Sequence, residues 1–160
     1  MTVRLPPFQS LVDAHGQDVR RFLIATVGSV DADDCYQETW LAALRAYPQL
    51  RDAANLRGWL FTIAHRKAID HVRGRARRAS PVADAAELAP PAVAPAADGP
   101  DGDLWSAVAA LPTKQRTAVA LRFIADSAYA EIAGAMECSE EAARQNVHEG
   151  LKRLRREHQR

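Results

Sequence analysis

Side chains that can read DNA bases lie along one face of the C-terminal segment, residues 139–157. A helix with 3.6 residues per turn that buries Ala143, Val147, Leu151 and Leu154 turns a polar face outward. Arginine and glutamine are residue types that hydrogen-bond to base edges in the major groove. The outward face comprises Glu141, Arg144, Gln145, His148 and Lys152, and Arg153 beside it can reach phosphates. A solvated face on a terminal helix is the alternative.

The residues before this helix favour the DNA-binding interpretation. A helix is expected over about 127–136, followed by the tight turn Glu137-Cys138-Ser139. Ser139 is a good N-cap, and acidic residues in the next turn suit the positive end of the helix dipole. A helix, a short turn and a capped basic helix together are the helix-turn-helix pattern.

A second basic stretch, residues 66–78, contains six Lys or Arg and one acid. Such clustering suits phosphate neutralisation. Trp59, Phe61 and His65 precede it, and aromatic rings beside a basic face suit single-stranded DNA, because bases stack on rings. Burial of Trp59 in a core is an equally good interpretation. Phe61 lies off the main apolar stripe, which favours a functional role.

The segment 33–41 has a polar face opposite Tyr36 and Trp40. This face comprises Asp34, Gln37, Glu38 and Leu41. It suits either solvent or a partner helix, and periodicity cannot choose between them.

The sequence shows no catalytic or metal-binding pattern. No P-loop, GxGxxG, HExxH or GxSxG motif is present. Cys35 and Cys138 stand 103 positions apart, without the spacing of a zinc site. We therefore expect neither an enzyme nor a metal or other cofactor, and we expect two free thiols.

The elements that must position these residues are all expected to be helices. Alanine makes up 32 of the 160 residues, which favours helices, and no alternating strand pattern of useful length occurs. Three helices are expected in the N-terminal part: from about Phe8 to Val27, from an N-cap at Asp31 to Pro48, and from about Asn55 through the basic stretch. Four are expected after residue 103, the second opened by Pro112. The fold class is all-α.

A break in composition divides the chain. Residues 79–103 contain nine Ala, five Pro and five acids, but no Lys or Arg. This composition indicates a flexible linker between a helical domain at 1–78 and a four-helix domain at 104–160. Residues 1–79 carry 12 basic and 8 acidic side chains, residues 80–104 carry none and 5, and residues 105–160 carry 9 and 7. Two basic modules are thus joined by an acidic tether.

No segment suggests a membrane protein. The longest apolar run, 22–27, is too short to span a bilayer, and the N-terminus lacks the apolar region of a signal peptide. We expect a cytoplasmic protein without membrane insertion.

Four stretches carry a family resemblance: 31–47, 55–78, 110–123 and 127–156. In this order, around an Ala/Pro linker, they resemble the extracytoplasmic-function (ECF) subfamily of the sigma-70 family of bacterial RNA polymerase sigma factors. The resemblance implies a promoter-specificity subunit that binds core RNA polymerase, recognises −10 and −35 elements and promotes melting.

The resemblance also assigns roles to residues. The polymerase-binding positions would be Asp34, Gln37, Glu38 and Leu41. The positions that meet the −10 element and the melted non-template strand would be Arg51, Asp52, Asn55, Arg57, Trp59, Phe61, His65, Arg66 and Arg73. The −35 duplex would meet the outward face of the last helix. An anti-sigma factor is a family-level expectation.

The chain departs from the family pattern in two places. Glu137 replaces the usual glycine of the turn, and Glu149-Gly150 replaces a basic residue followed by alanine. Each is expected to cost about 1 kcal/mol, so we predict that the −35 module alone binds DNA weakly. Two other classes remain: a helix-turn-helix regulator that works without polymerase, and a small nuclease or recombinase, for which no convergent acids or nucleophile appear.

Overall fold

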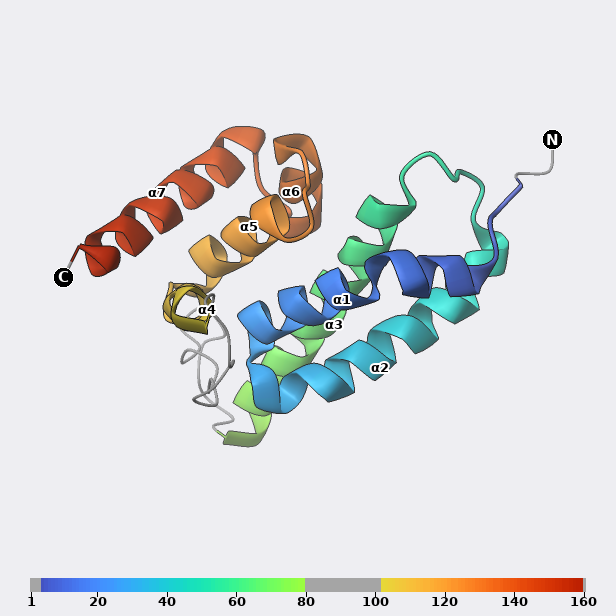
Figure 1. Cartoon of the computed structure of the whole chain (residues 1–160), viewed down its shortest axis with the longest axis horizontal. Coiled ribbons are helices and arrows are strands. Elements are labelled where there is room, and N and C mark those ends of the chain that lie inside the picture. Colours follow the sequence, from blue (N-terminus) through green and yellow to red (C-terminus); the bar gives the residue numbers. More distant parts are fainter. Residues whose placement is uncertain (1–3, 80–101, 160) are drawn as a thin grey trace.

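The computed structural model describes residues 4–79 and 102–159, which form seven α-helices, one short 3-10 helix and no strand (Figure 1). The expected all-α fold is thereby confirmed. The elements are α1 (Phe8–Val27), α2 (Ser29–Ala46), η1 (Tyr47–Gln49), α3 (Leu56–Ala79), α4 (Gly102–Ala109), α5 (Thr113–Phe123), α6 (Tyr129–Met136) and α7 (Glu140–His158). The predicted linker lies almost wholly outside the described residues, so the domain boundaries stay a prediction.

The N-terminal module packs α1, α2 and α3 around one apolar core. Helix α1 contributes Phe22 and Leu23, α2 contributes Cys35, and α3 contributes Leu60 and Phe61, all buried. The rings of Phe22 and Phe61 meet edge to face, with centroids 5.6 Å apart at 84°, a favourable arrangement for aromatic rings. This contact fixes α3 against α1.

The connection between α1 and α2 is tighter than the sequence suggested. Gly28 has φ 88°, a backbone conformation that L side chains rarely adopt, and α2 begins at the next residue. The predicted N-cap at Asp31 is therefore wrong, because the glycine turns the chain straight from one helix into the other. The predicted stop at Pro48 is close: α2 ends at Ala46, and Pro48 lies in η1.

A buried arginine organises the C-terminal module. Arg116 on α5 is 2% exposed and donates from Nη1 to the carbonyl oxygens of Ala109 (3.1 Å) and Leu111 (3.4 Å). The first carbonyl belongs to the last residue of α4 and the second to the connection that follows it, so the guanidinium joins the end of α4 to α5. Burial lowers the pKa of Arg116. Pro112, expected inside the first turn of α5, is instead its N-cap residue.

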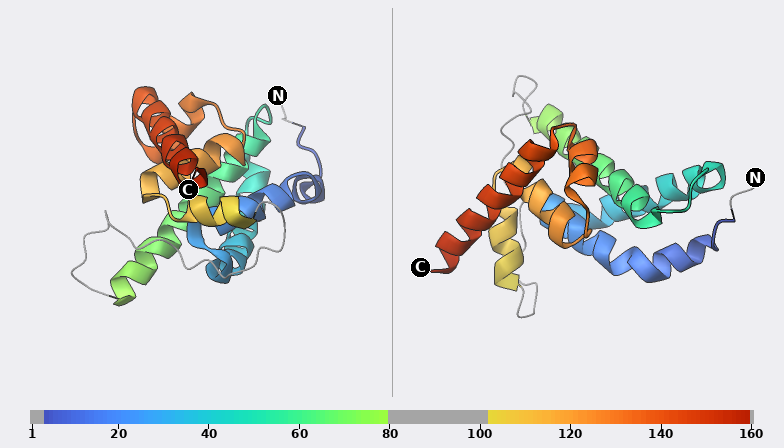
Figure 2. Two further views of the ribbon diagram at one scale, coloured as in Figure 1. Left: turned by 60° about the vertical axis from the view of Figure 1, so that its left-hand side comes forward. Right: turned by 90° about the horizontal axis from the view of Figure 1, so that it is seen from above.

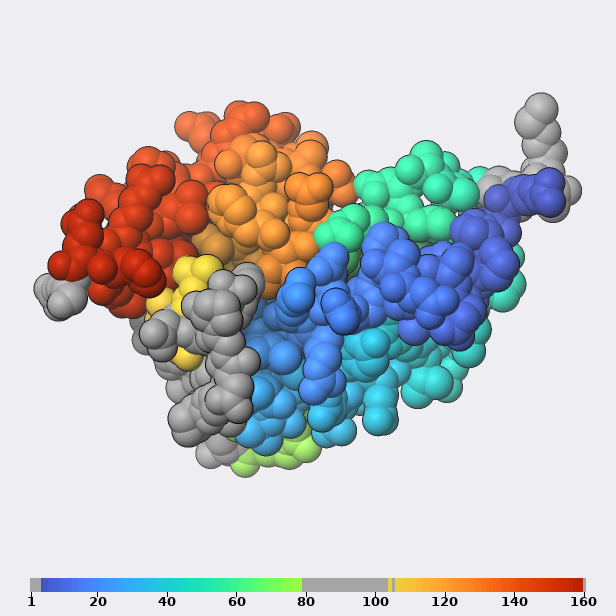
Figure 3. Space-filling view, in the orientation of Figure 1, coloured from blue at the N-terminus to red at the C-terminus, as the bar shows by residue number. Residues whose placement is uncertain are grey.

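The two modules lie against each other. Helix α1 contacts α4 and α5, and α3 contacts α6. Figures 1 and 2 show α4–α7 gathered at one side of the three N-terminal helices, and Figure 3 shows the contact from one face. Within residues 4–79 and 102–159, no helix has the length and apolar character needed to cross a bilayer.

Candidate nucleic-acid and protein interfaces

The turn between α6 and α7 has the geometry that the sequence predicted. Ser139 Oγ accepts a hydrogen bond from the Ala142 backbone N–H at 3.0 Å, which confirms it as the N-cap. Glu137 adopts the left-handed conformation, with φ 54° and ψ 46°, and Cys138 N donates to the Ala133 carbonyl at 3.0 Å. The turn therefore holds α7 at a fixed angle to α6. Its left-handed position is occupied by Glu137 and not by the glycine that adopts this conformation most easily.

Helix α7 buries one face and presents the other. Ala143 and Val147 are buried, and Leu151 and Leu154 pack partly buried against the same core. All six predicted −35 residues are exposed: Glu141, Arg144, Gln145, His148, Lys152 and Arg153. The structure thus brings them together on one open helix face, and their contact with DNA stays a prediction.

A tyrosine on α6 supports the central arginine of that face. The guanidinium of Arg144 lies 5.1 Å from the centroid of the Tyr129 ring, and that of Arg122 lies 4.6 Å from it. Arg122 is itself held by a 2.9 Å hydrogen bond to the Ser127 carbonyl. This cation–π contact could not be predicted from the sequence, because nothing in the spacing indicates which ring an arginine approaches.

Gly150, an apparent weakness in α7, has a packing role. A Cβ atom at this position would lie 2.7 Å from Cγ2 of Val119 on α5. The glycine therefore lets α7 approach α5 more closely than any side chain would allow. The expected cost of glycine inside a helix is offset by this close contact.

The predicted polymerase-binding residues share a groove between α2 and α3. Asp34, Gln37, Glu38 and Leu41 are all exposed and line a space of about 750 Å³ together with Arg75, Arg78 and other residues of the two helices. Leu41 is 53% exposed and its neighbour Leu44 is 51% exposed. Acidic, basic and apolar groups thus stand side by side on this surface.

An ion-pair cluster holds the two walls of the groove together. Asp31 on α2 pairs with Arg75 on α3, and its Oδ1 lies 3.4 Å from Nε2 of His71. Beneath the groove, burial raises the pKa of the Cys35 thiol to about 12, and Glu38, Asp31 and Asp34 add to the effect. Cys35 is therefore an inert core thiol.

The loop before α3 is held by its own polar side chains. Asp52 Oδ1 accepts a hydrogen bond from Ala54 N at 2.8 Å, and Asn55 Oδ1 accepts one from Gly58 N at 2.9 Å, at the start of α3. Arg51 remains exposed. Arg66 and Arg73, further along α3, are also exposed.

The residues of α3 whose rings were predicted to stack on DNA bases are partly or fully buried. Trp59 is partly buried and packs against the ring of Tyr47, with centroids 6.1 Å apart. Phe61 is 1% exposed and His65 is 4% exposed. Neither Phe61 nor His65 can touch DNA in this arrangement, because α1 covers the first and the C-terminal module covers the second. Phe61 was predicted to have a functional role because it lies off the main apolar stripe of α3. Its burial in the core shows that this prediction of its position was wrong.

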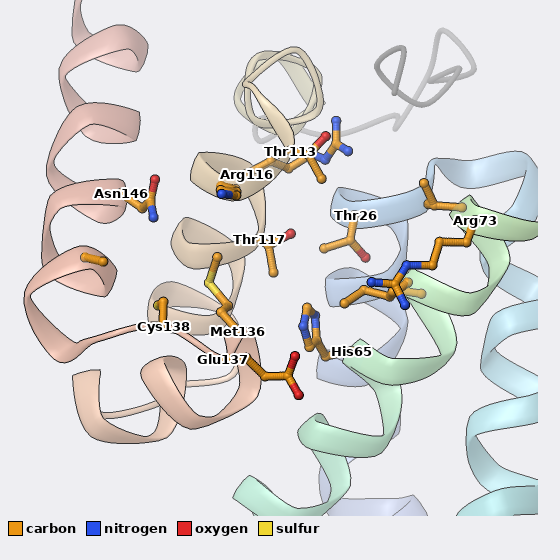
Figure 4. Close-up of a pocket in the computed structure, with 15 residues that line it drawn as sticks. Thr26, His65, Arg73, Thr113, Arg116, Thr117, Met136, Glu137, Cys138 and Asn146 are labelled. Carbon is orange, nitrogen blue, oxygen red and sulfur yellow. The ribbon is translucent and has the colours of Figure 1, made fainter. Parts of the chain in front are cut away.

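A cavity of about 340 Å³ lies between the modules, beside His65. Figure 4 shows His65 and Arg73 of α3 across it from Thr117, Met136 and Glu137. Burial lowers the pKa of His65 to about 4, although a hydrogen bond to the backbone of Ala135 opposes the shift and Arg66 adds to it. In the described ranges, no group of three His, Cys, Asp or Glu residues is placed to hold a metal ion.

Comparison with protein families identifies both modules. Residues 11–78 match sigma-70 region 2, and residues 101–154 match sigma-70 region 4. The chain is 27% identical over 159 residues to the ECF RNA polymerase sigma factor SigX of Bacillus subtilis, a match that covers 93% of this chain and 82% of SigX. It is 40% identical over 67 residues to the ECF RNA polymerase sigma factor SigC of Mycobacterium tuberculosis. That second match covers 41% of this chain and only 35% of SigC.

Solved structures share the fold. The sigma factor RpoE of Bartonella quintana, in complex with the anti-sigma factor NepR, matches with a TM-score of 0.76 and 24% identity over 95% of this chain and 96% of that one. CnrH in complex with the cytosolic domain of CnrY matches with a TM-score of 0.63 and 21% identity over 92% of this chain and 84% of that one. These matches extend across both modules.

Proposed function

The chain belongs to the extracytoplasmic-function group of the sigma-70 family, and on that premise we propose that it is a promoter-specificity subunit of bacterial RNA polymerase. In this role it binds the core enzyme, recognises the −10 and −35 elements and promotes melting. The role is one of binding and not of catalysis. Because this role is carried out on chromosomal DNA, we propose that the protein is located in the cytoplasm.

One observation carries the proposal. A region 2 module whose groove is lined by acidic, basic and apolar side chains precedes a region 4 module whose helix-turn-helix presents six exposed polar side chains. A free DNA-binding regulator needs the second module only. The groove on the first module would serve as a docking surface for a protein partner, which a promoter-specificity subunit requires.

We assign the groove residues Asp34, Gln37, Glu38 and Leu41 to core polymerase. Within the described residues the carboxylates of Asp34 and Glu38 make no ion pair, and they stand beside exposed leucines. A basic helix with an apolar stripe is the partner that this combination fits. The −10 readers would be Arg51, Asp52, Asn55, Arg57, Trp59, Arg66 and Arg73, and the −35 readers the exposed face of α7.

A second protein partner is also proposed. Both solved structures reported above are complexes with another protein, in one case a named anti-sigma factor. We propose that an anti-sigma factor controls this chain as well.

A capture experiment tests the docking assignment. The full chain is immobilised and incubated with purified core polymerase, and the double variant Asp34→Ala/Glu38→Ala is compared with Asp13→Ala, which removes an exposed carboxylate from α1. We expect capture by the wild type and by the control, and loss of capture by the double variant. Unchanged capture by the double variant would show that the docking face lies elsewhere. A wild-type chain that binds duplex DNA but captures no core polymerase would favour the polymerase-independent regulator.

A further inference from the structure

The cavity between the modules is large enough to hold a small organic molecule. Its volume is about 340 Å³, whereas small-molecule sites in proteins typically occupy about 300–1,000 Å³. Helices α1 and α3 contribute one part of its lining, and α5, α6 and α7 contribute the other. A molecule bound there would touch both modules at once.

The charged side chains of this lining favour an anion. Arg73 contributes from α3, and Lys114 and Arg116 contribute from α5. Glu137 is the one acid among the described residues that line the cavity, and none of these four side chains forms an ion pair within the described ranges. Figure 4 shows the guanidinium of Arg73 directed toward His65. Three cations against one acid leave the cavity with a surplus of positive charge.

Two buried polar atoms of the lining have no hydrogen-bond partner. Nε of Arg116 and Nε2 of His65 make no hydrogen bond within residues 4–79 and 102–159, although the two residues are only 2% and 4% exposed. The backbone satisfies Nη1 of Arg116, but its Nε–H can only donate and still needs an acceptor. Because a buried donor without an acceptor costs free energy, the cavity favours a ligand that brings oxygen atoms.

The apolar part of the lining is aliphatic. Ile69 and Val72 contribute from α3, Met136 from α6 and Ala142 from α7. No described residue of the lining is aromatic, so an aromatic ligand would gain no ring contact. A flexible alkyl chain suits these walls, because a methionine side chain adapts to irregular shapes and each buried methylene adds to affinity.

We propose that this cavity is a binding site for a medium-chain carboxylate, a small anion with an unbranched alkyl chain. The cationic side chains attract and orient the carboxylate, and Nε–H of Arg116 supplies a donor that no described residue uses. The alkyl chain packs on the aliphatic walls. Because the ligand touches both modules, its binding favours their packed arrangement over a separated one. The site does not depend on the proposed function, and its test needs neither DNA nor polymerase.

A methionine in the wall of the cavity gives a direct readout. The sequence has two methionines, so the full chain labelled with carbon-13 at its methionine methyl groups gives two NMR signals, and Met136→Leu identifies the one that lines the cavity. Octanoate should shift the Met136 signal saturably. Affinity should rise about fourfold for each methylene added from butyrate to octanoate. Octanol, which lacks the charge, should bind about tenfold more weakly than octanoate.

Substitutions of the lining test the assignment of the site. Arg73→Gln and Lys114→Gln each remove one cation and should weaken octanoate binding about tenfold. Ala142→Leu fills the cavity without changing a charge and should abolish the shift. Arg77→Gln and Lys67→Gln, both on α3 and outside the lining, are the matched controls and should bind octanoate like the wild type.

The possible results separate the site from simple attraction to a basic surface. No saturable shift of the Met136 signal with any carboxylate from butyrate to octanoate would overturn the site. Equal affinity for octanol and octanoate would overturn the assignment of an anion. Equal weakening by Arg73→Gln and Arg77→Gln would also overturn the site, because binding would then follow the overall charge of α3. If Ala142→Leu folds poorly, the two cation variants still decide the outcome. None of these results bears on the proposed function, which is tested separately by transcription.

Discussion

Acidification should destabilise the protein through His65. The imidazole is 4% exposed, in contact with the C-terminal module, and burial lowers its pKa from 6.5 to about 4. The folded protein therefore keeps His65 neutral, whereas the unfolded chain takes up a proton as the pH falls below about 6.5. Stability contributed by the neutral form is present above pH 6.5 and is lost progressively as the pH falls toward 4.

The size of the effect follows from the two pKa values. Each pKa unit is worth about 1.36 kcal/mol, so the full difference would approach 3 kcal/mol below pH 4. Between pH 7.5 and pH 5 the loss attributable to His65 is about 2 kcal/mol. This is a large fraction of the 5–15 kcal/mol typical of a domain.

Urea denaturation at the two pH values, followed by tryptophan fluorescence, measures this loss. His65→Gln should lower stability at pH 7.5 but should remove about 2 kcal/mol of the difference between pH 7.5 and pH 5. His148→Gln, which removes an exposed histidine from α7, should leave the difference unchanged. An equal pH dependence in the wild type and in His65→Gln would refute the reasoning, because the loss would then originate in other groups.

Three further substitutions test the C-terminal module. Gly150→Ala gains about 1 kcal/mol of helix propensity but forces a Cβ to within 2.7 Å of Val119. We expect a net loss of about 1 kcal/mol in the free energy of unfolding, measured by thermal denaturation. The double variant Gly150→Ala/Val119→Ala should recover this loss. Glu137→Gly relieves a left-handed residue and should raise stability by up to about 1 kcal/mol; a lower melting temperature would contradict this account of the turn. Tyr129→Leu removes the ring beneath Arg144 and should weaken binding of −35 duplex DNA about threefold in gel-shift assays. Tyr129→Phe keeps the ring and should bind like the wild type. Equal weakening by both substitutions would exclude the cation–π explanation.

Local features of the fold could be predicted from the sequence because local chemistry determines them. Ser139 was identified as an N-cap from its residue type and the acids after it, and its side chain accepts the expected hydrogen bond. The buried positions Ala143 and Val147 followed from helical spacing. The beginning of α2 was missed because Gly28 makes the turn through its backbone, and a nearby aspartate is a stronger sequence signal for a cap than a glycine.

Tertiary features could not be predicted in the same way. Phe61 lies off the apolar stripe of α3, yet α1 approaches from that side and buries it against Phe22. His65 and Arg57 look like surface residues of a basic helix until the C-terminal module covers them. No spacing within α3 encodes that approach. The predicted polymerase-binding face, in contrast, depends on one helix only, and its four residues do line one groove.

Run-off transcription tests the central claim most directly. The full chain is added to core polymerase on a library of genomic fragments, and the 5′ ends of the transcripts are mapped. The proposed function predicts start sites that depend on this chain and share one pair of upstream elements at −10 and −35. A chain that captures core polymerase but yields no promoter-dependent transcript from any fragment would contradict it.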